Sequence, residues 1–268
     1  MSSTLATSVS ALSTGAIGRS NESASLAGAF AELDVQRTDE WGWDNYERVV
    51  KHLATRFGAG QLLEIGGGRA PMFTVAELAR MGMELTVNDI SAAELARLPS
   101  GYHTARFDVS ETLPADIARN TYDLAFSRMV FEHVEDGRQA WKNLHAVLRP
   151  GGVAIAFIPT LFCFPFVVNW LIPDRLAKRI AEVLDRGRSD ETVPVFPARY
   201  SWSYSIERWL RPMLTGIGYR EVAIVPFYGH RYYSRFPVVR DVHAWFTELA
   251  RRNDWRIFSS YTYIVVRK

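Results

Sequence analysis

The sequence predicts an α/β fold in which a mostly parallel sheet is covered by helices on both faces. Two observations support this prediction. Short apolar segments alternate with helix-like segments along residues 60–160, and a glycine-rich turn joins the first apolar segment to the helix that follows. The chain has 268 residues, of which 48% are hydrophobic, so it can bury a full core. We expect one enzyme domain that bears an insertion.

Composition excludes several classes of protein. Cys163 is the only cysteine, which rules out an intramolecular disulfide and fits a reducing compartment, so we expect a cytoplasmic protein. The net charge is +2 and the basic residues are scattered among acidic ones, a pattern that indicates no nucleic-acid groove. No apolar run reaches the roughly 18 residues that a membrane-spanning helix needs, so we expect no transmembrane segment.

The first expected strand, residues 62–63 and their neighbours, ends in the glycine-rich turn. Gly66, Gly67 and Gly68 let the backbone take positive φ angles and let a ligand approach without a Cβ atom in the way. The helix that follows points unpaired N–H groups into the same space. The simpler alternative is a tight turn without a ligand, because a glycine motif alone is a weak signal.

The second and third expected strands each end in an acid. Residues 83–88 lead into Asp89, whose carboxylate could accept both hydroxyls of a ribose bound across the first turn. The alternative for Asp89 is to cap the helix that begins near residue 92, a role that Ser91 could fill equally well. Residues 102–109 place Asp108 where it could bind the amino group of an adenine, with turn chemistry as the alternative.

Two further strands complete the alternation. Residues 122–126 form the fourth expected strand, which leads into residues 127–136 and then a helix to residue 148. A turn at residues 149–152 precedes the fifth strand, residues 153–158. The order of strands and helices is that of a parallel sheet.

Together these motifs resemble the class I S-adenosylmethionine-dependent methyltransferases, in their small-molecule branch, over roughly residues 60–160. The resemblance implies a Rossmann-like, doubly wound sheet of seven strands, in which the last strand, residues 259–267, lies antiparallel between strands five and six. It also implies S-adenosyl-L-methionine as the cofactor. The residues at matching positions are then expected to bind that cofactor: Glu64, Gly66, Gly67, Gly68, Asp89, Ile90, Asp108, Val109, Ser127 and Arg128.

Two other classes of protein remain open. A nicotinamide-dependent dehydrogenase also carries spaced glycines, but its third glycine would fall at Pro71, and the methyltransferase motif has the small Ala70 instead. A non-catalytic cofactor-binding or scaffold protein could keep the same fold. Glu64, Asp89 and Asp108 are all present, which favours an enzyme over such a relative.

The chain divides into four expected regions. Residues 1–25 are rich in Ser, Ala and Thr and are predicted to be a disordered tail, residues 26–160 form the cofactor-binding core, residues 161–204 a cap, and residues 205–268 the rest of the core with strands six and seven. Trp41, Trp43 and Tyr46 lie on a helix that ends before Gly58. They either line the pocket or pack this helix on the sheet, and the second interpretation is favoured.

The cap begins with the apolar and aromatic segment 161–172, and a helix opens at Pro173. An insertion here lies beyond the carboxyl edge of the sheet, where open α/β folds bind ligands. We expect an α-helical cap around a small-molecule acceptor with an apolar or aromatic body. An ordinary packed subdomain, a homodimer face and an interfacial membrane helix are the alternatives. After the cap, Ser205 is expected to cap a helix over residues 205–214, followed by a strand at 219–227 and a helix at 241–251.

Methyl transfer to a protonated acceptor needs a base, and two histidines are candidates. His133 follows the fourth strand at the expected pocket mouth, with capping of the next helix as its alternative role. His230, in the polar and aromatic loop 228–237, is the runner-up. Some quinone-pathway O-methyltransferases carry a Glu-x-x-Glu-His metal motif here. Met129 replaces the first acid and leaves only Glu132 and His133, so no metal site is expected; the sequence does not identify oxygen, nitrogen or carbon as the methylated atom.

Overall fold

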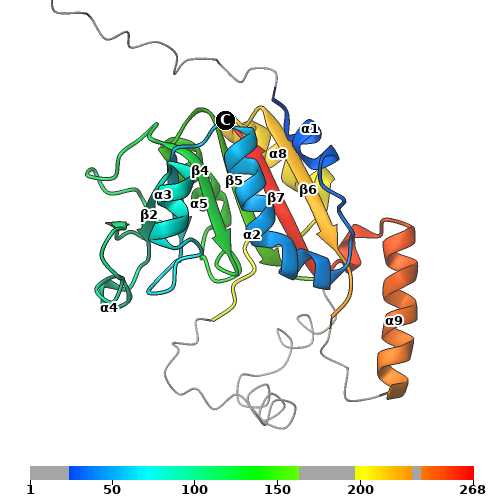
Figure 1. Ribbon diagram of the computed structural model, residues 1–268. Coiled ribbons are helices and arrows are strands. Elements are labelled where there is room, and N and C mark those ends of the chain that lie inside the picture. Colours follow the sequence, from blue (N-terminus) through cyan, green and yellow to red (C-terminus); the bar gives the residue numbers. More distant parts are fainter. Residues whose placement is uncertain (1–23, 163–196, 231–236) are drawn as a thin grey trace, which may run out of the picture.

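A single seven-stranded sheet forms the centre of the computed structural model, which describes residues 24–162, 197–230 and 237–268. The strand order is β3-β2-β1-β4-β5-β7-β6 (Figure 1). Strands β1 to β5 pair in parallel, and β7 pairs antiparallel with both β5 and β6, which confirms the expected topology. The bounds are β1 Gln61–Ile65, β2 Glu84–Asn88, β3 His103–Ala105, β4 Tyr122–Arg128, β5 Leu148–Pro159, β6 Glu221–Phe227 and β7 Tyr261–Arg267.

Helices cover both faces of the sheet (Figure 1). One apolar cluster joins the sheet to α5 and α8, and a second joins the opposite face to α1, α2 and α3. Strand β5 contributes alternate residues to the two clusters, because a strand covered on both faces must be apolar throughout. The helices are α1 Leu26–Ala31, α2 Asp39–Arg56, α3 Val75–Met81, α4 Ala92–Leu95, α5 Gly137–Val147, α8 Glu207–Ile217, α9 Pro237–Arg252 and the 3₁₀ helix η2 Arg256–Phe258.

The long helix α2 packs along one face of the sheet. Its Tyr46 is fully buried and donates its hydroxyl proton to the carbonyl of Ser127 at 2.6 Å. Trp41 is also buried and stacks on Phe227 with 5.9 Å between ring centroids. Packing therefore accounts for Trp41 and Tyr46, as favoured from the sequence, whereas Trp43 stays partly exposed.

Several boundaries differ from the sequence prediction. Strand β5 begins at Leu148, so the turn predicted at residues 149–152 is wrong; this segment lies within the strand, where the pairing with β4 shifts register between Tyr122 and Leu124. The third strand keeps only three residues in the ladder, since the chain turns away toward Asp108. Helix α8 is preceded by Ile206 without a side-chain cap, because the hydroxyl of Ser205 donates instead to the carbonyl of Arg256 at 2.7 Å. Helix α9 begins at Pro237, ahead of the predicted start, in keeping with the preference of proline for the first helical turn.

Two predicted regions fall largely outside the described residues. Residues 1–23 of the expected tail are among them, although Ser25 already caps helix α1 through its hydroxyl, which accepts from the amide of Gly28. Residues 163–196, which make up most of the expected cap, also lie outside the described residues. The disordered tail and the helical cap therefore stay predictions. Among the helices that the structure describes, none is both long and apolar enough to cross a membrane.

Candidate active site

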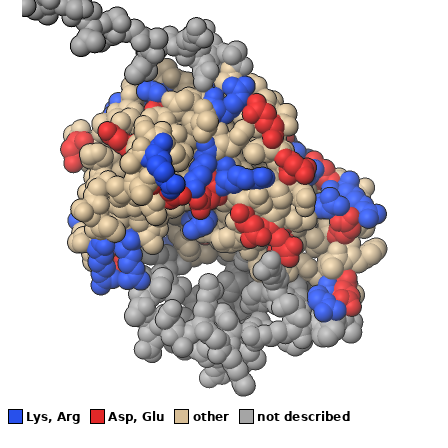
Figure 2. All heavy atoms as spheres, in the orientation of Figure 1, with Lys and Arg blue, Asp and Glu red and all other residues tan. Residues whose placement is uncertain are grey.

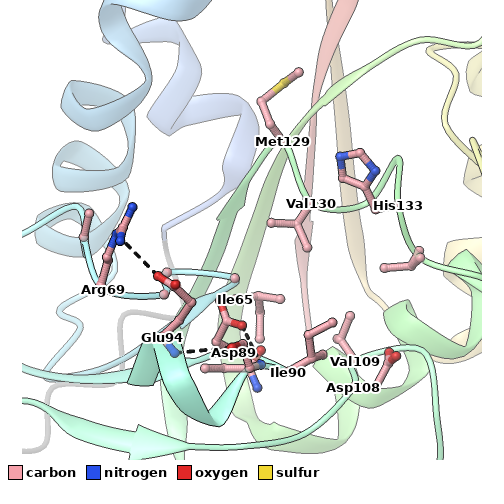
Figure 3. Close-up of a pocket in the computed structure, with 17 residues that line it drawn as sticks. Ile65, Arg69, Asp89, Ile90, Glu94, Asp108, Val109, Met129, Val130 and His133 are labelled. Atoms are coloured by element: carbon pink, nitrogen blue, oxygen red, sulfur yellow. Dashed lines mark hydrogen bonds and ion pairs between the residues drawn. The ribbon is translucent and has the colours of Figure 1, made fainter. Parts of the chain in front are cut away.

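A cavity of about 480 Å³ opens at the carboxyl edge of β1, β2 and β4 (Figure 3). Eight of the residues singled out from the sequence line it: Gly66, Gly67, Gly68, Asp89, Ile90, Asp108, Val109 and His133. The structure thus brings together three glycines, two acids and a histidine from segments far apart in the chain. Glu64, Ser127 and Arg128 are not among the lining residues.

The glycine turn after β1 cannot accept side chains. Gly66 has φ 71°, and a Cβ atom there would lie 2.5 Å from Cγ2 of Val130. A Cβ atom on Gly67 would lie 2.8 Å from Cγ1 of Val87, and Gly68 has φ 51°. Gly67 is thus packed against Val87 on the strand side and Gly66 against Val130 at the edge of the cavity, while the turn presents bare backbone to the cavity.

Asp89 does not cap the helix that follows it; Ser91 does. Ser91 caps the short helix α4, because its hydroxyl accepts from the amide of Glu94 at 3.3 Å. One carboxylate oxygen of Asp89 accepts from the amide of Ser91 at 2.8 Å. The other oxygen lies beside Gly68, where a Cβ atom would be 3.3 Å from it. Asp89 can thus present an acceptor oxygen to the cavity at the end of β2.

Asp108 has both of the roles considered for it. Its Oδ1 accepts from the amide and from the hydroxyl of Ser110, both at 2.7 Å, which is turn chemistry. It also lines the cavity. The two functions are compatible, since a carboxylate has about four acceptor positions and the turn takes two of them.

Asn88 was not identified from the sequence, yet it holds this side of the cavity together. Its side chain is buried at the end of β2 and donates to the carbonyls of Ala105, at 3.0 Å, and Phe107, at 2.9 Å. These bonds fix the segment that carries Asp108 after β3 has ended. A polar residue at the end of an otherwise apolar strand was the available signal.

Replacing Asn88 with alanine is expected to lower the free energy of unfolding by roughly 2 kcal/mol, because a buried carbonyl and a partly buried one lose their donor. Urea denaturation of the free protein measures this loss. The control is Asn253→Ala, since Asn253 is exposed and bonds only to the carbonyl of Leu249 among the described contacts. Equal denaturation midpoints for the two variants would show that the Asn88 bonds add no stability.

Glu64 lies behind the glycine turn. Its buried carboxylate accepts from the amide of Met72 with both oxygens, at 3.0 and 3.2 Å, and its Cδ would be 3.0 Å from a Cβ atom on Gly67. Burial raises the pKa of Glu64 to about 7, against the opposing effects of the Met72 bond and the charge of Arg128. Glu64 thus braces the turn from the strand side.

Stability is expected to depend on the Glu64 proton. Between about pH 4.5 and about pH 7 the native carboxyl stays protonated while the unfolded one is ionised, so the free energy of unfolding falls as pH rises through this window. The fall from this group is about 3 kcal/mol. In Glu64→Gln the difference between unfolding at low and neutral pH should shrink. A slope identical to that of the wild type would contradict the assignment, and the exposed Glu84→Gln serves as control.

His133 reaches the cavity from the segment after β4. Its Nδ1 lies 3.3 Å from the carbonyl oxygen of Pro197, and its Nε2 lies 3.7 Å from Oε1 of Glu132. Asp136, not His133, caps helix α5, because its carboxylate accepts from the amide of Gln139 at 2.9 Å. The capping alternative for His133 is therefore not what the structure shows.

Glu132 is a buried acid beside this histidine. Its side chain is almost fully enclosed, and burial raises its pKa to about 7. Within the described part of the chain, its Oε2 is buried without a hydrogen-bond partner. Its other oxygen, Oε1, lies 3.7 Å from Nε2 of the neighbouring His133. The buried Glu132 carboxyl and the His133 ring therefore lie side by side at this wall of the cavity.

His230 does not reach this cavity. It lines a second cavity that shares no lining residue with the first, and its ring stacks on Tyr261 with 5.8 Å between centroids. Burial, with a smaller effect from His243, lowers the pKa of His230 to about 4. Strands β5 and β7 separate β6 from β4, so the two candidate histidines line different cavities among the described residues, and a role of His230 as base stays a prediction.

Two further features of the cavity were missed from the sequence. Arg69 and Glu94 face each other across its edge, with 3.5 Å between Nε and Oε2 (Figure 3). Met129 takes a left-handed conformation, φ 59°, while its amide donates to the carbonyl of Phe157 at 2.8 Å. Met129, Val130 and His133 lie on one side of the cavity in Figure 3, opposite Asp89 and Asp108.

The described residues offer no ready metal centre. Across residues 24–162, 197–230 and 237–268, no three His, Cys, Asp or Glu side chains gather around one point. Met129, at the place of the first acid of the Glu-x-x-Glu-His motif, provides a thioether that suits soft metals rather than Mg²⁺.

Comparison with known proteins agrees with this geometry. Residues 63–156 match the family model described as a methyltransferase domain. A phosphoethanolamine N-methyltransferase of Triticum aestivum is 30% identical over 114 residues, which cover 41% of this chain and 23% of that protein. A malonyl-(acyl-carrier protein) O-methyltransferase of Pseudescherichia vulneris is 40% identical over 79 residues, 28% of this chain and 30% of that protein.

The fold has a solved counterpart. The crystal structure of an S-adenosylmethionine-dependent methyltransferase from Mesorhizobium loti superposes with a TM-score of 0.50 at 16% identity, over 82% of this chain and 96% of that one. The family model and the sheet topology together identify residues 63–156 as part of a class I methyltransferase domain. S-adenosylmethionine is the cofactor of this domain class, and the dehydrogenase alternative is set aside. The chain spans less than a third of the length of the two curated relatives described above.

The residues present fit this cofactor. The three glycines line the cavity with backbone that carries no side chain, which leaves room for the methionine part. The Asp89 carboxylate suits the two ribose hydroxyls, and Asp108 suits the adenine amino group. Apolar side chains of Ile90 and Val109 stand between these acids, where an aromatic base can lie against them.

Proposed function

We propose that this protein transfers the methyl group of S-adenosylmethionine to a small-molecule acceptor with an apolar or aromatic body. The observation that carries the proposal is that His133, Met129 and Val130 lie opposite the two acids in one cavity. A sulfonium makes its methyl group electrophilic, so the protein has to align the acceptor, exclude water and remove a proton where the acceptor carries one.

The surroundings of that side of the cavity support an acceptor with an apolar or aromatic body. Met129 hydrogen-bonds through its amide to Phe157, and the ring of Phe157 meets that of Trp43 edge-on at 4.9 Å. Trp43 also contacts Tyr261 at 5.6 Å and remains 38% exposed. These rings form an aromatic cluster near the Met129 side of the cavity; Phe157 and Tyr261 are buried, so Trp43 is the ring on which an acceptor could stack.

The methylated atom is left open within this proposal. The relatives named above act on nitrogen in one case and oxygen in the other, by their names, so the shared domain is compatible with either. A hydroxyl acceptor is the case in which His133 would act as base. A carbon or already ionised acceptor would depend on positioning alone.

A nucleic-acid substrate is disfavoured. On the face seen in Figure 2, basic and acidic side chains alternate, and Lys51 on α2 pairs with both Glu47 and Glu77. Basic side chains that are neutralised by acidic neighbours do not form the positive surface that binds a phosphate backbone. A cytoplasmic location, which the single cysteine supports, and a homodimer remain parts of the proposal that need direct measurement.

The test of the proposal is cofactor binding by Asp89→Ala. Wild-type protein is expected to bind S-adenosylmethionine and S-adenosylhomocysteine, and the variant more than tenfold more weakly, because it loses charge-assisted bonds to the ribose. Isothermal calorimetry measures both affinities. Asp116→Ala, an exposed acid outside the cavity, is the matched control and should bind like the wild type. No heat with the wild type, or equal affinity in Asp89→Ala, would refute the assignment.

A further inference from the structure

Residues 197–203 lie against the segment that follows β4. The amides of Arg199 and Tyr200 both donate to the carbonyl of Glu132, at 2.6 and 2.9 Å. The guanidinium of Arg199 also bonds to the carboxylate of Glu135 at 3.3 Å. Three hydrogen bonds thus join the two segments, although Arg199 and Glu135 are 64 residues apart in the chain.

The start of helix α5 is fitted to the same residues. The amide of Gly137 donates to the hydroxyl of Ser201 at 2.9 Å. Gly137 is buried, and a Cβ atom there would overlap the carbonyl oxygen of Ser201. Glycine at position 137 therefore allows a closer approach of the two segments than a residue with a side chain would.

The 197–203 segment is also held from the side of β5. The amide of Leu161, just after β5, donates to the carbonyl of Ser203 at 2.7 Å. Within the segment, Tyr200 and Trp202 take left-handed conformations, with φ of 51° and 59°. Such conformations cost free energy in residues other than glycine and persist only where the surrounding contacts hold them. The contacts with the ends of β4 and β5 therefore define the conformation of this segment.

The 197–203 segment contacts the ring of His133 directly. Nδ1 of His133 lies 3.3 Å from the carbonyl oxygen of Pro197. A carbonyl oxygen only accepts hydrogen bonds, so in the neutral imidazole this nitrogen carries the hydrogen. The unshared electron pair then belongs to Nε2, whose 3.7 Å distance from Oε1 of Glu132 is longer than a hydrogen bond. The same ring lines the cofactor cavity (Figure 3).

We propose that the 197–203 segment positions His133 for catalysis. The carbonyl of Pro197 fixes the tautomer in which Nε2 can accept a proton, and the contact of Ser201 with Gly137 holds that carbonyl in place. Pro197 and Ser201 do not line the cavity, so they are positioning residues that act through the imidazole.

This inference rests on the proposed function, in which His133 is the base for a hydroxyl acceptor. The acceptor hydroxyl gives its proton to Nε2 while its oxygen bonds to the methyl carbon. The bond between that carbon and sulfur breaks, its electron pair stays on sulfur, and the sulfonium becomes the neutral thioether of S-adenosylhomocysteine. The opposite tautomer would present a hydrogen at Nε2 and could not take this proton.

Nitrogen-15 NMR of the histidine rings in the full chain measures the tautomer without any need for activity. At about pH 8.5, where an ordinary imidazole is neutral, the ring of His133 should carry its hydrogen at Nδ1. The signal that disappears in His133→Ala identifies this ring. Exposed His103 is the internal reference for a ring in water. A wild-type His133 with its hydrogen at Nε2, or with mixed tautomers, would overturn the proposal.

Gly137→Ala separates the two segments, and Gly216→Ala is its matched control. Both glycines lie in helices, α5 and α8, where alanine is the better helix former. A Cβ atom at Gly216 has no neighbour within 4 Å, whereas one at Gly137 meets Ser201. Gly137→Ala should mix the tautomers of His133 and lower kcat by roughly tenfold or more, with affinity for S-adenosylhomocysteine within about twofold of the wild type. Gly216→Ala should match the wild type in all three measurements.

Ser201→Ala is the milder variant and covers the case in which Gly137→Ala does not fold. It removes the acceptor of the Gly137 amide and should lower kcat by about fivefold, the size of effect expected from one lost hydrogen bond. Ser201→Thr keeps a hydroxyl and should recover most of the rate. A Ser201→Ala protein that is less stable in urea but keeps the wild-type tautomer and kcat would show a structural role alone and overturn the proposal.

Failure of this inference can be distinguished from failure of the proposed function. A tautomer of His133 that is unchanged in both Gly137→Ala and Ser201→Ala refutes positioning by the 197–203 segment and leaves the base assignment intact. Wild-type turnover in His133→Ala instead removes the base from the proposed function, and with it the catalytic part of this inference, whatever the tautomer.

Discussion

His133→Ala is expected to lower the rate of methyl transfer to a hydroxyl acceptor by roughly 10² to 10⁴, the range typical of losing a general base. The side chain lines the cofactor cavity on the side of Met129 and Val130, and it does not cap the next helix. Affinity for S-adenosylhomocysteine should stay within twofold, since the acids that suit ribose and adenine lie on the opposite side.

The measurement is turnover across pH, with an acceptor identified by product mass spectrometry. His103→Ala is the control, because His103 is exposed at the far edge of the sheet on β3. His230→Ala is included because the loop after β6 also supplies a histidine at the carboxyl edge. If His133→Ala and His230→Ala both keep the wild-type rate and pH profile, neither is the base, and positioning supplies the acceleration.

Gly66→Ala is expected to weaken S-adenosylhomocysteine binding at least 30-fold. An alanine in the left-handed region costs about 1–2 kcal/mol, and overpacking adds about 1–3 kcal/mol. The new methyl group would lie 2.5 Å from Val130, so the turn must shift into the cavity that both residues line. A loss of about 2 kcal/mol in binding corresponds to the stated factor.

Gly82→Ala separates the two causes. Gly82 has a similar φ of 65° at the end of α3 and no atom within 4 Å of a Cβ position, so it feels the backbone cost alone. It should lose stability and keep cofactor affinity. Val130→Ala in the Gly66→Ala background should restore part of the binding. A double variant no better than Gly66→Ala would place the effect in the backbone conformation and not in the contact with Val130.

Periodicity and motifs were sufficient to predict the order of elements from α2 to β5 and the cluster of glycines and acids at the sheet edge. Parallel strands present their carboxyl ends at one edge, so residues at strand ends converge whatever their separation in the chain. Asn88 and the Arg69 and Glu94 pair were missed because their roles depend on side-chain contacts between segments. No periodic pattern encodes those contacts.

The location of His230 relative to the cofactor cavity could not be predicted from its place in the sequence. It follows a strand at the same edge of the sheet as His133, but β6 is the third strand from β4 in the observed order. At about 4.8 Å per strand this separates the two strand ends by roughly 14 Å. The position of a late strand in the sheet order, and not its position in the chain, decides which cavity its following loop can reach.

The place of β7 also determines when the sheet can be completed during synthesis. Strand β7 is made after the other strands, yet it lies between β5 and β6, and its Arg267 bonds to Glu221 of β6 and to the carbonyl of Ala24 ahead of α1. A nascent chain that stops short of β7 therefore leaves β6 without a neighbour and one edge of β5 open. Such edges pair readily with other chains. Ribosome-bound or truncated forms should thus depend on chaperones until β7 emerges, when both halves of the sheet close together.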